Sequence, residues 1–463
     1  MRKRLVIGAA GLVLLIAVGA AAALYFGSRR EVTTSSEPAY RAYREALENE
    51  RRFYYKEARD GFAKALELDP QFAEAMLGLS RMTRGDQGLA LVRRAAKLRD
   101  HLTERERMHV DMQLAKREGR SEDAVAIARR VHERYPDDVR AAMDLCEHEI
   151  MAGNGEKALQ IQAELLAVEP NNANAYNQIG YYYAYRGDYE KAIENIKKYQ
   201  FMAPDQANPY DSLGEIQAYS GHYDEAIGNL NQALKLKPDF FAAYLHMGIA
   251  YEGKGDYAKA IESFRKGAKE AMDEDLRHEH LRQALRAAYV AGDVPVAKEL
   301  ISELLVFPGE KHRELTRLAY DALLDLMEDR PVEAERRLRE LQPKVEAVDK
   351  QETKKESYGG PPHPDLTFLM AQALMRQGRV DQAIPLLEEL AGSPKPFVNF
   401  ESRRWVFAGR ALLAEAVARK GDLDRAEKLL VENRKWNPSW APAGPSEQVV
   451  AQLRREKVLA ATK

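Results

Sequence analysis

One long apolar run opens the chain, and beyond it small and hydrophobic residues return at a fixed interval. Residues 5–26 carry no charge, and MRKR precedes them while Arg29 and Arg30 follow. A helix of this length spans about 33 Å, enough for a hydrocarbon core of about 30 Å. We therefore predict a transmembrane anchor at 5–26. A signal peptide cut near Ala21–Ala23 is the alternative, although its apolar part is usually only about 7–15 residues long.

The flanking charges predict how the anchor is oriented. Arg2, Lys3, Arg4 and the α-amino group outnumber Arg29 and Arg30, and the more basic side stays in the cytoplasm. Residues 1–4 are then a cytoplasmic tail, residues 27–38 a linker, and the rest is exported. We expect a single-pass membrane protein with its main part in the periplasm or outside the cytoplasm.

Beyond the linker, three residue types repeat every 34 residues in one register. The repeated positions are Ala124, Ala158, Ala192, Ala226 and Ala260; Gly119, Gly153, Gly187, Gly221 and Gly255; and Pro136, Pro170, Pro204 and Pro238. The glycines suit a left-handed residue at the end of a first helix, and the prolines suit the end of a second. Weaker copies extend the series in both directions, so we count about eleven two-helix units.

Within one unit, Tyr176, Ile179, Gly180 and Tyr183 fall on one stripe of a helix at about 100° per residue. A glycine on that stripe lets the second helix approach closely. The chain has 31% charged residues, only 20 prolines and few runs of β-branched residues, a composition that favours helix nearly throughout.

The period and the order of aromatic, Leu-Gly, Ala and Pro positions closely resemble the tetratricopeptide repeat. This resemblance implies an all-α, right-handed α-solenoid at 39–438. We expect a loop insertion at 344–364, where the sequence is rich in charge, Gly and Pro, and a linker with a capping helix at 439–463. Residues 103–136 are also similar to the repeats that follow a transmembrane helix in certain bacterial receptor-type serine/threonine kinases and transcriptional regulators.

Charge and cysteine content exclude several function classes. The 70 basic and 72 acidic residues leave a net charge of −2, which provides no overall field for nucleic acid. A single cysteine, Cys146, excludes an intramolecular disulfide and a multi-thiolate zinc site. It occupies the small-residue position of its repeat, where we expect a buried and unreactive thiol.

Two motifs resemble ligand sites and fail on inspection. The run from Gly248 to Gly255 lacks the Ser or Thr of a phosphate-binding loop and would have to follow a strand, so we expect no nucleotide site. His278 and His280 lie two residues apart, which directs them away from each other on a helix; we predict surface histidines and no metal. No segment of about 60 residues remains for a catalytic domain, so we expect neither an enzyme nor a cofactor.

The resemblance implies a ligand groove on the inner face, which the first helices of the repeats line. It places six residues there: Asn177, Tyr181, Tyr185, Asp211, Glu215 and Tyr219. This acidic, tyrosine-rich set departs from the lysine, arginine and asparagine clamp of chaperone-binding members. We predict an extended peptide with basic or apolar side chains as ligand. The alternative is that tyrosine merely tolerates a half-wet concave surface.

These observations favour a non-enzymatic, membrane-anchored scaffold or adaptor that binds proteins or peptides at a bacterial envelope. One alternative is an exported sensory or regulatory ectodomain of a signalling system, whose effector would be a separate chain. Another is an accessory subunit of an enzyme that acts on envelope polysaccharide or peptidoglycan.

Overall fold

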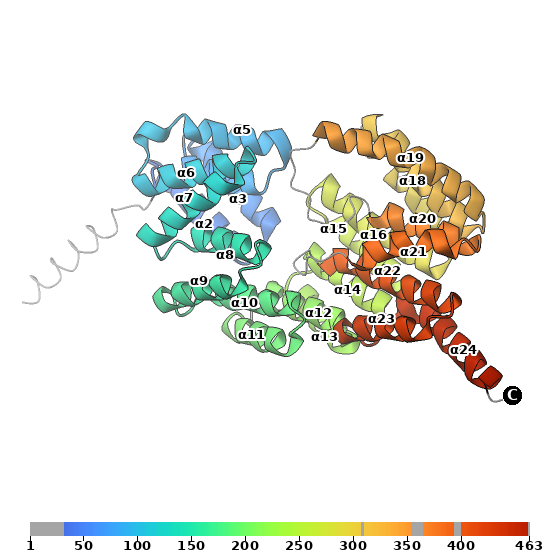
Figure 1. The fold of residues 1–463 in the computed structure, drawn as a ribbon. Coiled ribbons are helices and arrows are strands. Elements are labelled where there is room, and N and C mark those ends of the chain that lie inside the picture. The colour runs from blue at the N-terminus through green and yellow to red at the C-terminus, as the bar shows by residue number, and fades with distance from the viewer. Residues whose placement is uncertain (1–31, 307–309, 353–363, 393–399, 462–463) are drawn as a thin grey trace, which may run out of the picture. The chain divides into compact units, whose positions relative to one another are not determined.

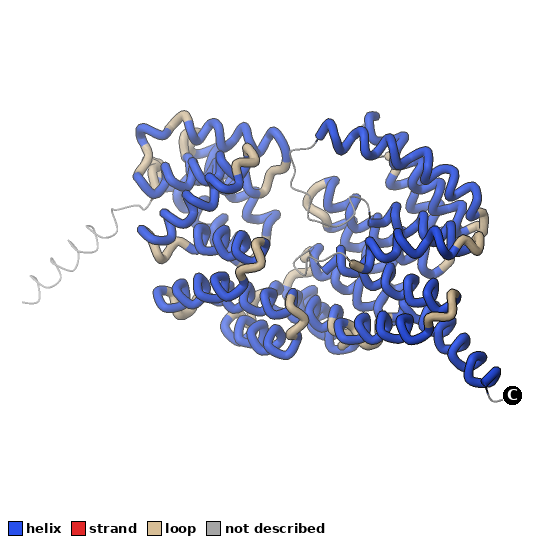
Figure 2. The backbone as a smooth tube through the Cα atoms, viewed as in Figure 1, coloured by secondary structure: helices blue, strands red, loops and turns tan. Residues whose placement is uncertain are grey.

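A computed structural model describes residues 32–306, 310–352, 364–392 and 400–461. These residues form α-helices α2 to α24, two 3-10 helices and loops, without a strand (Figures 1 and 2). The predicted all-α fold is therefore confirmed for the described ranges. The predicted anchor at 5–26 lies outside them, and no helix within them is long and apolar enough to cross a membrane.

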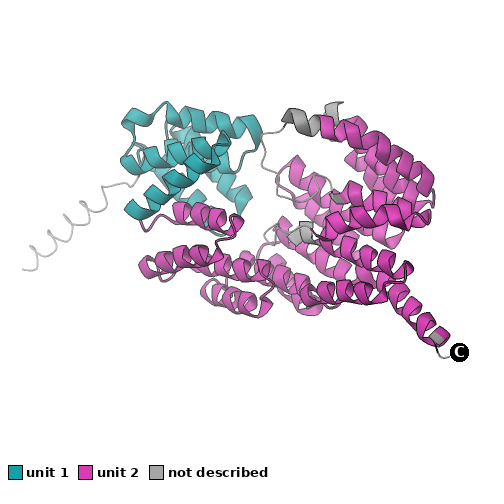
Figure 3. Cartoon of the chain, viewed as in Figure 1, with its two compact units in different colours: residues 1–135 teal, residues 136–463 magenta. Residues whose placement is uncertain are grey.

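The first compact unit ends at Tyr135 (Figure 3). Its described helices form three pairs: α2 (Glu37–Arg51) with α3 (Tyr55–Leu68), α4 (Ala73–Arg81) with α5 (Gly85–Ala96), and α6 (Glu104–Arg117) with α7 (Ser121–Arg134), with η1 (Arg99–His101) before α6. The first core groups the rings of Tyr43, Phe62 and Phe72, with Tyr43 and Phe72 only 4.8 Å apart between centroids. Aromatic side chains thus join consecutive repeats of this unit.

The second compact unit, 136–463, holds eight further helix pairs and a final helix. The pairs are α8 (Val139–Met151) and α9 (Gly155–Val168); α10 (Ala173–Tyr185) and α11 (Tyr189–Met202); α12 (Ala207–Tyr219) and α13 (Tyr223–Leu236); α14 (Phe241–Lys254) and α15 (Tyr257–Glu270); α16 (Glu274–Ala291) and α17 (Val294–Leu304); α18 (Glu310–Met327) and α19 (Pro331–Glu352); α20 (Pro364–Arg376) and α21 (Val380–Ala391); and α22 (Phe400–Arg419) and α23 (Leu423–Trp436). After η2 (Ala441–Ala443), α24 (Gly444–Ala461) packs on α22 and α23. The described part of the chain thus contains eleven helix pairs, which equals the number of repeats predicted.

The five glycines of the 34-residue series all have the positive φ that a turn between helices requires: Gly119, Gly153, Gly187, Gly221 and Gly255. Gly187 has a φ of +79° between α10 and α11, a conformation that only glycine adopts without strain. Asp188 then caps α11, because its carboxylate accepts a hydrogen bond from the backbone N–H of Lys191. Gly214 allows the two helices of its repeat to touch: a Cβ there would lie 2.6 Å from Cγ of buried Leu230.

Two further sequence features have defined places. Cys146 is buried on α8, its Sγ lies 3.7 Å from the carbonyl oxygen of Ala158, and burial raises the pKa of the thiol. Helix α19 is long and continues past Pro343 to Glu352. The rest of the insertion predicted at 344–364 lies mostly in residues 353–363, outside the described ranges.

The chain between α23 and η2 packs against repeats that lie about 220 residues earlier. The hydroxyl of Tyr223 donates to Oδ1 of Asn437 at 3.0 Å, and Oγ of Ser439 donates to the carbonyl of Gly221 at 3.3 Å. The ring of Trp436 meets Tyr189 edge-on at 6.5 Å. Figure 1 shows this red segment beside the green helices α12 and α14. Residues 436–441, which we call the closing segment, thus join the last repeat to the middle of the second unit.

The tight contact at Gly214 generates a test with a control on the adjacent helix. We expect Gly214→Ala to lower the free energy of unfolding by about 1–2 kcal/mol, since overpacking outweighs the gain in helix propensity. Gly228→Ala on α13 should instead raise it by up to about 1 kcal/mol, because its Cβ would meet open space. Urea unfolding of both variants measures the difference, and changes of the same sign would contradict the packing role of Gly214.

Candidate functional site

Four side chains on three first helices form one row of polar contacts, and three of them belong to the predicted groove. The hydroxyl of Tyr181 on α10 donates to Glu215 on α12. Nε2 of His246 on α14 lies 3.6 Å from Oε2 of Glu215, and its Nδ1 lies 2.8 Å from Oδ1 of Asp211. Burial, followed by the Glu215 and Asp211 charges, raises the pKa of the Tyr181 hydroxyl. The structure thus brings Tyr181, Asp211 and Glu215 together around a histidine that was not predicted.

The other three predicted groove residues differ in accessibility. Asn177 and Tyr219 are buried, whereas Tyr185 is half-buried and its ring lies 6.0 Å from that of Tyr181. Of these three residues, Tyr185 is therefore the one that a ligand can reach most easily. Ligand binding by the six residues stays a prediction.

The second unit also contains a cavity of about 710 Å³ between α16, α18, α20, α22 and the start of α24. Five arginines and three carboxylates line it: Arg282, Arg286, Arg376, Arg404 and Arg419, with Glu279, Asp365 and Glu415. We call it the arginine cavity. Its volume lies within the range of about 300–1,000 Å³ that is usual for ligand sites.

A buried ion-pair cluster forms the deep end of the arginine cavity. Glu252, which is 1% exposed, accepts hydrogen bonds from Arg286 and from Nη1 of Arg404 at 3.2 Å. Nη2 of Arg404 donates to Oε1 of Gln283 at 2.5 Å. Burial, followed by the charge of Arg404, lowers the pKa of Arg286 to about 10. Two guanidinium groups therefore share one buried carboxylate.

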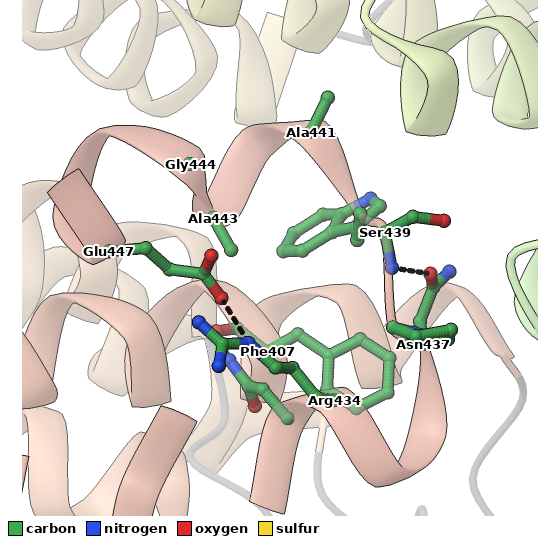
Figure 4. A pocket seen from close by; sticks show the side chains of 11 residues that line it. Phe407, Arg434, Asn437, Ser439, Ala441, Ala443, Gly444 and Glu447 are labelled. Atoms are coloured by element: carbon green, nitrogen blue, oxygen red, sulfur yellow. Dashed lines mark hydrogen bonds and ion pairs between the residues drawn. The ribbon is translucent and has the colours of Figure 1, made fainter. Parts of the chain in front are cut away.

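A smaller cavity of about 200 Å³ lies beneath the closing segment (Figure 4). Arg434 and Glu447 form an ion pair at 3.2 Å beside it, and the backbone N–H of Ser439 donates to Oδ1 of Asn437. Asn433 at its edge donates to the carbonyl of Phe407 at 2.9 Å. The polar side chains named here thus bond to groups of this part of the chain.

The two histidines of α16 differ from the surface pair that was predicted. His278 is half-buried, and His280 is buried beside Phe241 and Gly267, so the prediction is wrong for His280. Burial lowers the pKa of His280 to about 4. Within the described ranges, no three His, Cys, Asp or Glu side chains are grouped so that they could hold a metal ion.

Some of the arginine cavity was visible in the sequence. Ala184, Ala218, Glu252 and Arg286 occupy one repeat position at steps of 34 residues. The change from alanine to an opposite-charge pair, one repeat apart, is a signal that spacing alone could have revealed. Arg404 lies in a part of the chain where the 34-residue spacing is lost, so the sequence does not predict its contact with Glu252.

The buried histidine predicts a pH dependence of stability. Its pKa is about 4 when folded against an ordinary 6.5, so the unfolded chain binds more protons between these values and stability falls as pH falls through this window. Between pH 7 and pH 5 we expect the second unit to lose about 2 kcal/mol through this group. His280→Gln should remove that loss, whereas His222→Gln, at an exposed site, should retain it. Urea unfolding at pH 7 and pH 5 measures the free energy of unfolding of both variants. An equal decrease in both would contradict the assignment of the pH dependence to His280.

Four family models match parts of the chain. One, described as TPR repeat, matches 214–255. Three, described as tetratricopeptide repeat, match 115–180, then 173–206 together with 241–271, and finally 368–432. No curated protein matches the sequence.

Three solved structures are similar in part. The crystal structure of MamA is 23% identical with a TM-score of 0.29, and the match covers 34% of this chain and 93% of that chain. The APC/C hetero-tetramer Cut9-Hcn1 is 13% identical with a TM-score of 0.46, and the match covers 95% of this chain and 81% of that chain. Yeast Tom70 is 15% identical with a TM-score of 0.40, and the match covers 90% of this chain and 96% of that chain. Likenesses this weak carry no argument about partners. The family models and the helix pairs at the same positions together show that this chain contains tetratricopeptide repeats.

Proposed function

We propose that this protein is a non-enzymatic scaffold that binds protein partners or peptides through the first helices of its repeats. The observation that carries the proposal is that helical repeats and a final helix account for almost all described residues. The matching family models are all repeat models. Solenoids of this kind use extended surfaces for binding rather than a catalytic centre.

Tyr185 is the residue through which we propose to test binding at the predicted groove. Its ring packs on Tyr181, whose hydroxyl is already bonded to Glu215. A half-buried aromatic ring on such a base offers a rigid, partly apolar contact to a peptide side chain. Buried Asn177, Asp211 and Tyr219 would then support the surface rather than contact the ligand.

We further propose that residues 5–26 anchor the protein in a membrane and that the repeats lie on the extracytoplasmic side. The support is the length of the uncharged run and the excess of basic residues before it. Anchoring would restrict the partners to proteins of the same compartment. It would also raise their effective concentration near the repeats.

Binding is tested with the full chain as bait in an extract of envelope proteins. We expect partners identified by mass spectrometry to bind about tenfold more weakly after Tyr185→Ala, because central aromatic residues dominate such interfaces. The matched control is Tyr210→Ala on the next first helix, a half-buried tyrosine whose hydroxyl donates to the carbonyl of Pro204 at 3.1 Å. If both variants lose the same amount of binding, or if Tyr185→Ala loses none, the ligand groove does not lie at Tyr185.

Topology is tested with reporters fused to the C-terminus. We expect a reporter that matures only outside the cytoplasm to be active, because the basic residues hold the N-terminus inside. A fluorescent reporter that works only in the cytoplasm should stay dark. The reverse pattern would contradict the proposed orientation.

A further inference from the structure

We propose that the arginine cavity binds an acidic peptide segment, in which a carboxylate lies next to apolar side chains. The inference rests on the proposed function and names the ligand of a different surface from the tyrosine groove. That groove is acidic and suits basic side chains. The cavity instead has one more arginine than carboxylates when Glu252 at its deep end is included.

Arginines outnumber carboxylates around the cavity. Five arginines and three carboxylates line the cavity, and Glu252 at its deep end brings the carboxylates to four. Within the described residues, Nε of Arg286 is also buried without a hydrogen-bond partner. Glu252 pairs with both Arg286 and Arg404, whereas Arg282 and Arg419 each have a carboxylate of their own, Glu279 and Glu415. The excess positive charge therefore lies at the deep end, where an anionic group would complement it. Guanidinium groups bind carboxylates well because they donate two parallel hydrogen bonds.

The arginines become less exposed from the rim of the cavity to its deep end. Arg282 and Arg419 at the rim have side chains that are 55% and 48% exposed. At the deep end, the values fall to 13% for Arg286 and 4% for Arg404. A ligand carboxylate would first meet solvated cations and then less solvated ones, where electrostatic attraction is stronger. Such an arrangement admits a side chain or a chain end, rather than the surface of a folded domain.

An apolar wall lies beside the charged groups of the cavity. Leu285, Leu323, Leu369 and Leu412 line the cavity together with the rings of Phe368 and Trp405. The rings of Phe368 and Trp405 lie 5.7 Å apart, and the guanidinium of Arg286 lies 5.9 Å from the centroid of Trp405. Apolar side chains of a bound segment would be buried here beside its carboxylate. A small inorganic anion would leave this wall unused.

The closing segment forms part of the same cavity. Trp440 of this segment lines the cavity, as does Pro442 in η2 just after it. Contacts of Asn437 and Ser439 with Tyr223 and Gly221 hold the closing segment in place. The cavity wall is therefore built by residues far apart in the chain. We expect the site to require the complete second unit.

The test uses short fluorescent peptides of alternating Glu and Leu, with Lys–Leu and Gln–Leu peptides for comparison. Fluorescence anisotropy is measured with the full chain in lipid nanodiscs, and empty nanodiscs give the background. We expect the Glu–Leu peptide to bind at least about tenfold more tightly than the other two. Arg404→Gln should weaken its binding about tenfold or more, and Arg282→Gln, at the exposed rim, should weaken it by a smaller factor.

The control is Arg454→Gln, which removes an exposed arginine paired with Asp424 and Glu427 on the far C-terminal helix. It should leave peptide binding unchanged, and circular dichroism confirms that each variant is folded. Equal affinity for the three peptides would overturn the inference, as would no binding up to about 1 mM or equal weakening by Arg454→Gln. If partner capture still depends on Tyr185 in that case, the proposed function stands and only the cavity ligand is wrong.

Discussion

The close approach of the two helices within each repeat is the constraint on which the rest of the structure depends. It requires a small residue at one position of the first helix, and Gly180 and Gly214 hold this position in successive repeats. With a side chain there, Ile196 and Leu230 would have to move, and the core beneath them would open. The same contact fixes the rotation of each helix pair, and so decides which residues face inward.

A fixed step also turns sequence spacing into contact between side chains. Tyr181 and Glu215 lie 34 residues apart and hydrogen-bond across consecutive repeats; Glu252 and Arg286 do the same further along the chain. Repetition thus stacks polar groups into rows on the first helices. One row ends in an acidic, tyrosine-rich patch, and the other ends at two buried arginines that share the carboxylate of Glu252.

Periodicity predicted the fold well because each repeat is defined by local contacts. The turn glycines, the aspartate caps and the number of helix pairs could all be predicted from residues less than 40 positions apart. The site was less predictable. Glu252 and Arg286 left a visible signal in the 34-residue register, but Arg404 and Asn437 reach their partners across more than 150 residues of irregular spacing. The exposure of His280 was predicted wrongly, because the spacing of residues shows which face of a helix a side chain lies on but not which other elements cover that face.

The central claim is that the closing segment completes the second unit and its arginine cavity. Most of residues 436–441 lie outside helices. They nevertheless form hydrogen bonds to the repeat of α12 and α13, for example to Gly221 in the turn between these two helices. Hydrogen exchange of the full chain tests this most directly. The account predicts that the amide of Ser439, which donates to buried Asn437, exchanges about as slowly as the middle of α23. Exchange at the rate of an unstructured peptide would contradict the closure, and with it the cavity that the closure completes.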